Sequence, residues 1–125
     1  MTELEINPED IITRLKNSIN NGTMGRDYVI LPRDKNKELT YKYLIDTNKQ
    51  KEILLSLTTD DYISSETSIN KDFPNDIVHI FYKKVNLIPL IDRGISYKKV
   101  PIYIKFTWPD QEEILLIISF HEAEK

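Results

Sequence analysis

Two histidines and a tyrosine–lysine pair are the residues of this chain best suited to acid–base chemistry. Tyr103 and Lys105 alternate with apolar residues, His121 follows an apolar run, and His79 lies within another. Imidazole changes its charge near neutral pH, and lysine and tyrosine stabilise developing negative charge. If one face of a sheet carries them together, these residues can cleave RNA. One group would take the 2′-hydroxyl proton, another would protonate the leaving oxygen, and lysine would stabilise the phosphorane.

The same histidines also have a plain structural interpretation. A histidine at the end of a strand is held rigidly and reaches solvent, which suits a general acid or base, but such histidines also occur without any chemical role. The pattern of residues alone leaves both interpretations open for His121.

Strand alternation indicates which of these side chains can meet. In the run 102–106, Tyr103 and Lys105 point away from the face that carries the apolar residues. If this run pairs with 114–121 as a hairpin, both can share a face with Ser119 and His121. Alternation along 114–121 places Ser119 and His121 on the face of Leu115 and Ile117. Alternation along 77–85 places His79 with Phe81 and Lys83.

Charge is distributed unevenly along the chain. The net charge is −3, yet the segment 77–108 carries six basic residues against one acidic residue, Asp92. A basic face with aromatic neighbours can bind RNA through phosphate contacts and base stacking, or can dock on an acidic protein. Solubilising lysines at a sheet edge are a third explanation. The candidate ligands of the RNA backbone are Arg33, Lys35, Lys83 and Lys84. Arg33 and Lys35 also fit a solvated turn.

Composition bounds the class of protein. A chain of 125 residues, 40% apolar and 30% charged, predicts one globular domain spanning 1–125. There is no cysteine and no histidine–carboxylate spacing typical of a metal site, so we expect neither a metal nor a cofactor. No apolar run is long enough for a membrane span, and the first residues do not resemble a signal peptide, so we expect a soluble cytoplasmic protein.

The elements that must position these residues follow from periodicity and capping. Asn7 and Pro8 start a helix that we expect to reach Asn21, and Asp46 or Thr47 caps a second helix. The segment 33–37 is typical of a charged turn, 38–44 fits a short helix or a strand, and 64–75 is typical of a loop. We expect strands at 26–31, 77–85, 100–106 and 114–121, with a possible short strand at 87–91 in the long connection 86–100. Helices first and strands last predict an α+β domain with a mainly antiparallel C-terminal sheet, covered by the N-terminal helices on one face.

Several segments, taken in order, resemble toxins of the MqsR family of type II toxin–antitoxin systems. The similarity runs from about Ile30 to the C-terminus. It is carried by Pro-Arg-Asp-Lys-Asn at 32–36, Ile-Leu-Leu-Ser-Leu-Thr-Thr-Asp-Asp-Tyr at 53–62, Asp-Phe-Pro-Asn-Asp-Ile at 72–77, Ile-Tyr-Ile-Lys at 102–105 and Ile-Ser-Phe-His-Glu-Ala-Glu at 118–124.

The resemblance implies a RelE-like, MqsR-like α+β fold and a metal-independent mRNA interferase that a cognate antitoxin holds inactive. By position, Tyr103 and Lys105 correspond to the family's tyrosine and lysine, and His121 to its final polar residue. His79 falls near a family glutamine and Ser64 near a family lysine. The proposed catalytic set is therefore His121, His79, Tyr103 and Lys105.

A non-catalytic interaction protein is the alternative from a different class. An immunity or phage accessory domain would use the basic face to dock on an acidic partner and would not need His121. The distances between the candidate side chains distinguish an enzyme from an interaction protein, because concerted catalysis requires each group to reach the reacting proton directly or through one water. Histidines more than about 10 Å from each other and from Tyr103 and Lys105 cannot act as one set.

Overall fold

The computed structural model describes residues 6–67, 76–90, 97–109 and 114–123 and shows an α+β arrangement of helices on a five-stranded sheet. In the described part of the chain, the elements are α1 (Pro8–Asn20), β1 (Tyr28–Ile30), α2 (Asp34–Lys42), α3 (Thr47–Leu55), the 3₁₀ turn η1 (Thr59–Asp61), β2 (Tyr62–Thr67), β3 (Ile77–Leu87), β4 (Lys98–Thr107) and β5 (Leu115–Glu122). No helix within these ranges is long and apolar enough to cross a membrane.

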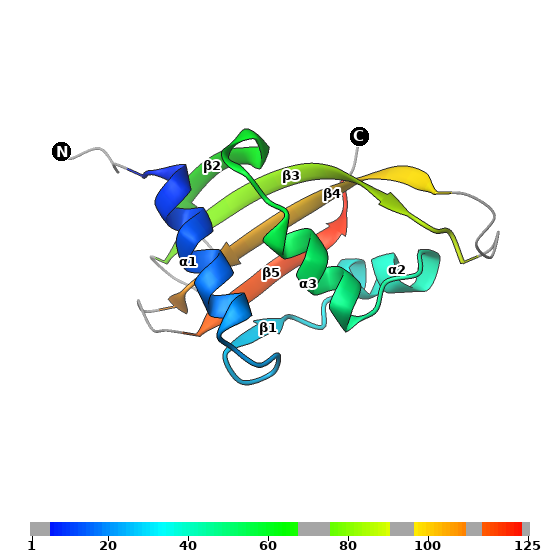
Figure 1. Cartoon of the computed structure of the whole chain (residues 1–125), viewed down its shortest axis with the longest axis horizontal. Coiled ribbons are helices and arrows are strands. Elements are labelled where there is room, and N and C mark those ends of the chain that lie inside the picture. The colour runs from blue at the N-terminus through cyan, green and yellow to red at the C-terminus, as the bar shows by residue number, and fades with distance from the viewer. Residues whose placement is uncertain (1–5, 68–75, 91–96, 110–113, 124–125) are drawn as a thin grey trace.

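The sheet is mixed rather than purely antiparallel. Its strand order is β1-β5-β4-β3-β2, and β2 to β5 pair antiparallel in sequence order (Figure 1). The short strand β1 adds to the β5 edge in parallel, with Tyr28 opposite Leu115. The α+β class and the antiparallel body of the sheet were therefore predicted correctly, and β1 contributes the parallel pair.

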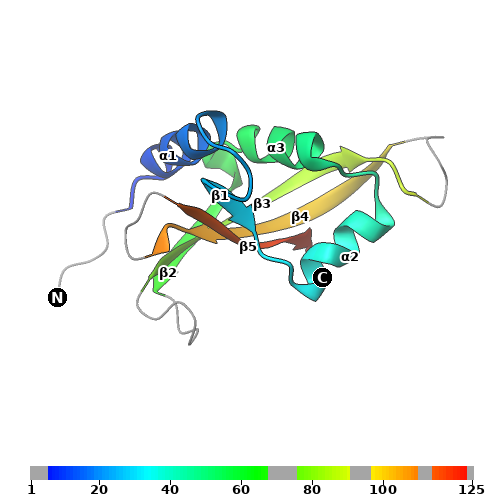
Figure 2. The same ribbon diagram turned by 90° about the horizontal axis from the view of Figure 1, so that it is seen from below.

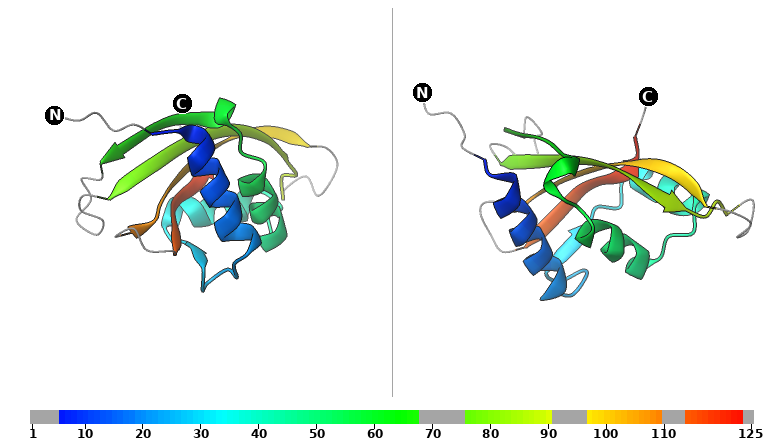
Figure 3. Two further views of the ribbon diagram at one scale, coloured as in Figure 1. Left: turned by 60° about the vertical axis from the view of Figure 1, so that its left-hand side comes forward. Right: turned by 45° about the horizontal axis from the view of Figure 1, so that its top comes forward.

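Two helices form a layer on one face of the sheet. α1 and α3 contact each other and lie on the same side of the strands, while α2 lies apart from them beside β5 (Figures 2 and 3). α1 forms because Asn7 accepts a hydrogen bond from Glu9 N at 3.0 Å and Pro8 occupies the first turn. The core beneath this layer joins apolar residues of α1 to β3, β4 and β5, among them Leu15, Ile19, Phe81, Ile104, Phe106, Ile117 and Phe120.

Two segments differ from the sequence-based expectation. The charged turn expected at 33–37 is the start of α2, which continues through Lys42, so 38–44 is largely helical. Leu39 and Tyr43 lie four residues apart, on one side of this segment, and both are buried in the core, which outweighs the strand propensity of the local sequence. Residues 64–67, expected in a loop, belong to the edge strand β2, which pairs with β3. Their polar side chains give no strand pattern in the sequence. The rest of that expected loop, 68–75, lies outside the described residues.

A β-bulge in β5 interrupts the strict alternation of side chains that the sequence predicted for this strand. Lys105 is opposite Ser119 but Phe106 is opposite Ile117, so Ile118 is the extra residue on β5. Leu115 and Ile117 therefore face the helices, as does Phe120 beyond the bulge. Ser119 and His121 turn to the opposite face, which we call the outer face. The single face predicted for Leu115, Ile117, Ser119 and His121 is wrong for this reason.

Candidate functional site

A cleft of about 660 Å³ lies between the outer face of the sheet and the start of α2. It brings together side chains from three strands and one helix that are far apart in the sequence. The residues that line it are Arg33, Asp34, Lys35, Asn36, Tyr82, Tyr103, Lys105, Ser119, His121 and Ala123. Five of the residues singled out from the sequence are among them: Arg33, Lys35, Tyr103, Lys105 and His121.

Strand register fixes the floor of the cleft. Tyr103 is directly opposite Tyr82 on one side and His121 on the other, so these three rings form a row across β3, β4 and β5. The rings of Tyr103 and His121 are stacked, with centroids 5.3 Å apart and planes at 27°. The neighbouring row places Lys105 beside Ser119. The hairpin pairing of Tyr103 and Lys105 with Ser119 and His121 is confirmed.

His121 is held in one orientation by the backbone carbonyl of the next residue. The distance from its Nδ1 to the carbonyl oxygen of Glu122 is 3.0 Å. Because a carbonyl only accepts hydrogen bonds, Nδ1 carries the proton and donates. In the neutral ring Nε2 then has a free lone pair. This half-buried imidazole is arranged to accept a proton from a bound molecule.

Tyr103 stays in its protonated form at neutral pH. Burial raises the pKa of the phenol above its ordinary value of 10.0, and the negative charge of Glu66 raises it further. The hydroxyl is therefore a hydrogen-bond donor in the cleft and does not act as a base.

Charge in the cleft favours an anion. Arg33 and Lys35 come from the start of α2 and Lys105 from β4, whereas Asp34 is the one carboxylate among the lining residues. Three cations around a hydrogen-bond donor and an imidazole form an environment that attracts a phosphodiester.

Asn36 joins α2 to the bulge, and this role is not evident from the sequence. Its side chain is only 6% exposed and reaches the main chain of β5 beyond the end of β1. Nδ2 donates to the carbonyls of Leu31 (2.9 Å) and Ile118 (3.0 Å), and Oδ1 accepts from Phe120 N at 2.9 Å. The Asn36 amide thus makes the hydrogen bonds to the main chain of β5 that a neighbouring strand would otherwise make. It does so at the point where Ser119 and His121 turn into the cleft. In sequence, an asparagine between two lysines is typical only of a solvated turn.

The structure does not place His79 in the cleft. It lies on the helix-covered face, 8% exposed, with its Nδ1 2.7 Å from Ser65 Oγ. Its ring centroid is 5.7 Å from Phe106 and 6.0 Å from Trp108. Burial, with the nearby positive charge of Arg14, lowers its pKa to about 4. His79 is a neutral core residue across the sheet from His121, and we remove it from the candidate catalytic set.

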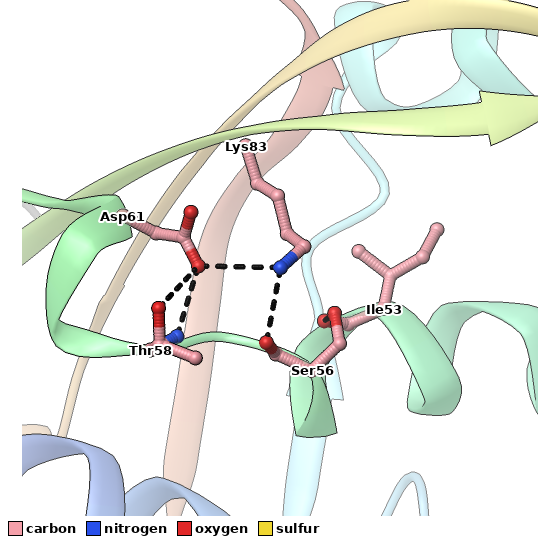
Figure 4. A network of polar contacts seen from close by, with 5 residues as sticks. All are labelled: Ile53, Ser56, Thr58, Asp61 and Lys83. Carbon is pink, nitrogen blue, oxygen red and sulfur yellow. Dashed lines mark hydrogen bonds and ion pairs between the residues drawn. The ribbon is translucent and has the colours of Figure 1, made fainter.

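Lys83 has a structural role rather than a place in the cleft. On the helix-covered face its Nζ donates to Ser56 O at 3.1 Å and pairs with Asp61 Oδ2 at 3.4 Å (Figure 4). The same Asp61 oxygen accepts from the backbone N of Thr58 at 2.9 Å, which closes the capping box of η1. Lys83 therefore attaches the α3–η1 connection to β3. Lys84, the next residue, is exposed on the outer face outside the cleft lining.

Ser64 lies on the outer face in the row of Lys105, separated from it by Ile80. It does not line the cleft, and its Oγ donates to Glu66 Oε1 at 3.3 Å. Among the described residues no group of three or more histidine or carboxylate side chains could hold a metal ion.

Comparison with models of protein families, with curated protein sequences and with solved structures gives no match for this chain. The resemblance to the MqsR family is therefore supported by the segments quoted above alone, and the case for a site depends on the geometry of the cleft.

Proposed function

We propose that this protein is a metal-independent endoribonuclease, an mRNA interferase toxin of a type II toxin–antitoxin system with an MqsR-like fold. The observation that carries the proposal is the cleft, where Tyr103, Lys105 and His121 converge beside Arg33 and Lys35. The proposed partners are mRNA in the cytoplasm and a cognate antitoxin.

The chemistry follows from what each side chain can do. Nε2 of His121 takes the proton of a ribose 2′-hydroxyl, and the 2′-oxygen attacks the adjacent phosphorus. Tyr103 donates a hydrogen bond to the phosphorane, and Lys105 balances its additional negative charge. The bond from phosphorus to the 5′-oxygen breaks, that oxygen takes a proton from solvent water, and the imidazolium of His121 returns its proton to solvent. The products are a 2′,3′-cyclic phosphate and a 5′-hydroxyl.

Cleavage of a purified single-stranded RNA in excess EDTA tests this proposal. We expect the wild-type protein to cut it, and we expect His121→Ala to lose roughly 10²–10⁴ in rate because one positioned base is removed. The matched control is the other histidine: His79→Phe keeps an aromatic ring in the core and should retain cleavage. Thermal unfolding of both variants shows whether each is folded.

Three results would contradict the proposal. A folded His121→Ala protein that cleaves at the wild-type rate excludes this residue from the mechanism. Cleavage that EDTA abolishes and magnesium restores excludes a mechanism based on side chains alone. A wild-type protein that binds RNA or an acidic protein, cleaves nothing and leaves mRNA intact when expressed in growing cells supports the non-catalytic alternative.

A further inference from the structure

A second hollow of about 410 Å³ adjoins the cleft at His121. Three residues, Lys35, His121 and Ala123, line both spaces. The second hollow extends from them along α2, and its remaining lining residues are Glu38, Leu39, Lys42 and Glu122. His121 therefore stands between two connected spaces.

A polynucleotide needs room on both sides of the bond that is cut. With the scissile phosphate at His121, the nucleotide on one side occupies the cleft and the chain must leave past the imidazole. We propose that the second hollow is the subsite for the adjoining nucleotide of the RNA chain, with Lys42 as the ligand of its phosphate. This inference rests on the proposed function and deepens it.

The positions of the charged side chains fit this assignment. Lys35, Glu38 and Lys42 follow one another at spacings of three and four residues, which places them on one side of α2. Lys42 is exposed and has no ion pair within the described part of the chain. It is therefore available to a phosphate at the far end of the hollow.

The two carboxylates of the hollow have different roles. Glu122 accepts a hydrogen bond from the Tyr43 hydroxyl at 2.9 Å, and so helps to attach α2 to β5. Glu38 is exposed and would repel a phosphate, but a carboxylate accepts hydrogen bonds from a ribose hydroxyl or a base amino group. We therefore assign the phosphate to Lys42 and the ribose hydroxyl to Glu38.

The two spaces also differ in their aromatic content. The cleft contains Tyr82 and Tyr103, on which a base can stack, whereas the described lining of the second hollow has no tyrosine, phenylalanine or tryptophan and shares only the His121 ring with the cleft. The second nucleotide would be held mainly through its backbone. We expect this subsite to add affinity for longer RNA without adding a strong base preference.

Binding to the His121→Ala protein tests the subsite without cleavage. The probes are a fluorescent single-stranded RNA of twelve mixed nucleotides and uridine 3′-phosphate, which is short enough to occupy the cleft alone. Adding Lys42→Ala should weaken binding of the 12-mer roughly threefold and lower its salt slope by about 0.7, the value for one phosphate contact to a single strand. Binding of uridine 3′-phosphate should not change.

Lys37→Ala is the matched control, because Lys37 is an exposed lysine of the same helix that lines neither space. It should leave 12-mer binding unchanged. Equal effects of Lys42→Ala and Lys37→Ala, with Arg33→Ala still weakening the 12-mer, would overturn the subsite and leave the proposed function intact. If the 12-mer binds no variant and the wild-type protein cleaves no RNA, both are overturned.

Discussion

At the scale of single residues, Asn36 joins α2 to the bulge of β5, next to the point where Ser119 and His121 enter the cleft. Its amide makes three hydrogen bonds in a nearly water-free position. In Asn36→Asp the carboxylate cannot donate to the carbonyls of Leu31 and Ile118 and places a charge in this site. We expect the free energy of unfolding to fall by about 2–4 kcal/mol, measured by chemical denaturation.

The same chemical change at an exposed asparagine provides the control. Asn48→Asp, in the first turn of α3, should alter stability by only a few tenths of a kcal/mol. ¹⁵N NMR of the His121 ring in a milder variant, Asn36→Ala, should show loss of the single Nδ1–H tautomer. An Asn36→Asp protein as stable as wild type would show that the amide does not hold the bulge.

His79 gives the protein a stability that depends on pH. Its pKa is about 4 when folded and 6.5 when exposed, so between these values the unfolded chain binds more protons. The contribution is complete above pH 6.5 and is lost as pH falls toward 4. We expect the free energy of unfolding to drop by on the order of 2–3 kcal/mol across this window.

His79→Phe tests the source of that dependence, since phenylalanine preserves packing against Phe106 and Trp108 but cannot be protonated. Urea unfolding between pH 4 and 7 should give a slope smaller by about one proton than that of wild type. If the two slopes are the same, acid sensitivity arises in other groups.

At the scale of elements, successive side chains of β3 point to opposite faces of the sheet, so the adjacent Lys83 and Lys84 lie on different faces. Lys83 bonds to Ser56 and Asp61 on the helix-covered face, and Lys84 points outward. Lys83→Ala should therefore lower the free energy of unfolding by about 1 kcal/mol or less, because its ion pair is partly exposed, and leave RNA affinity unchanged. Lys84→Ala should leave stability unchanged and, because Lys84 lies on the outer face but outside the cleft lining, should weaken RNA binding less than loss of Arg33 or Lys105 does. Loss of RNA affinity on Lys83→Ala in a stable protein would contradict this division.

The elements also show how far a sequence can predict this fold. α1 was recognisable because Asn7, Pro8 and four apolar residues at helical spacing all agree. α2 was recognised only in part: 38–44 fitted a short helix or a strand and 33–37 a turn, because the stability of this helix comes from Leu39 and Tyr43 in the distant core. The bulge in β5 depends on Asn36, which is 82 residues away from Ile118, so no local pattern could reveal it.

For the site, alternation correctly joined Tyr103 and Lys105 to His121, because the strand carrying Tyr103 and Lys105 has one apolar and one polar side. Alternation also correctly grouped His79 with Phe81 and Lys83. It did not show which face of β3 the helices cover, because β3 is apolar on both sides at its start, with Val78 and Ile80 buried as well.

At the scale of the whole molecule, the net charge of −3 makes a general attraction to RNA weak. Affinity should come from cations concentrated in the cleft. Replacing Arg33 and Lys105 together with glutamine should weaken binding of a single-stranded RNA and lower its salt slope by about 1.4, equivalent to two phosphate contacts. The measurement is a titration at several salt concentrations with the His121→Ala protein, in which the RNA is not cut.

A variant with the same loss of charge but a different location is the control for this prediction. Lys16 and Lys51 belong to α1 and α3, the helices of the layer on the opposite face from the cleft. Lys16→Gln with Lys51→Gln changes the net charge equally, so a slope that depends on total charge would fall equally in both double variants. A slope determined by the cleft falls only when Arg33 and Lys105 are replaced. An equal decrease of the salt slope in both double variants would show that RNA binding depends on the charge of the whole protein. The cleft would then not be the binding site.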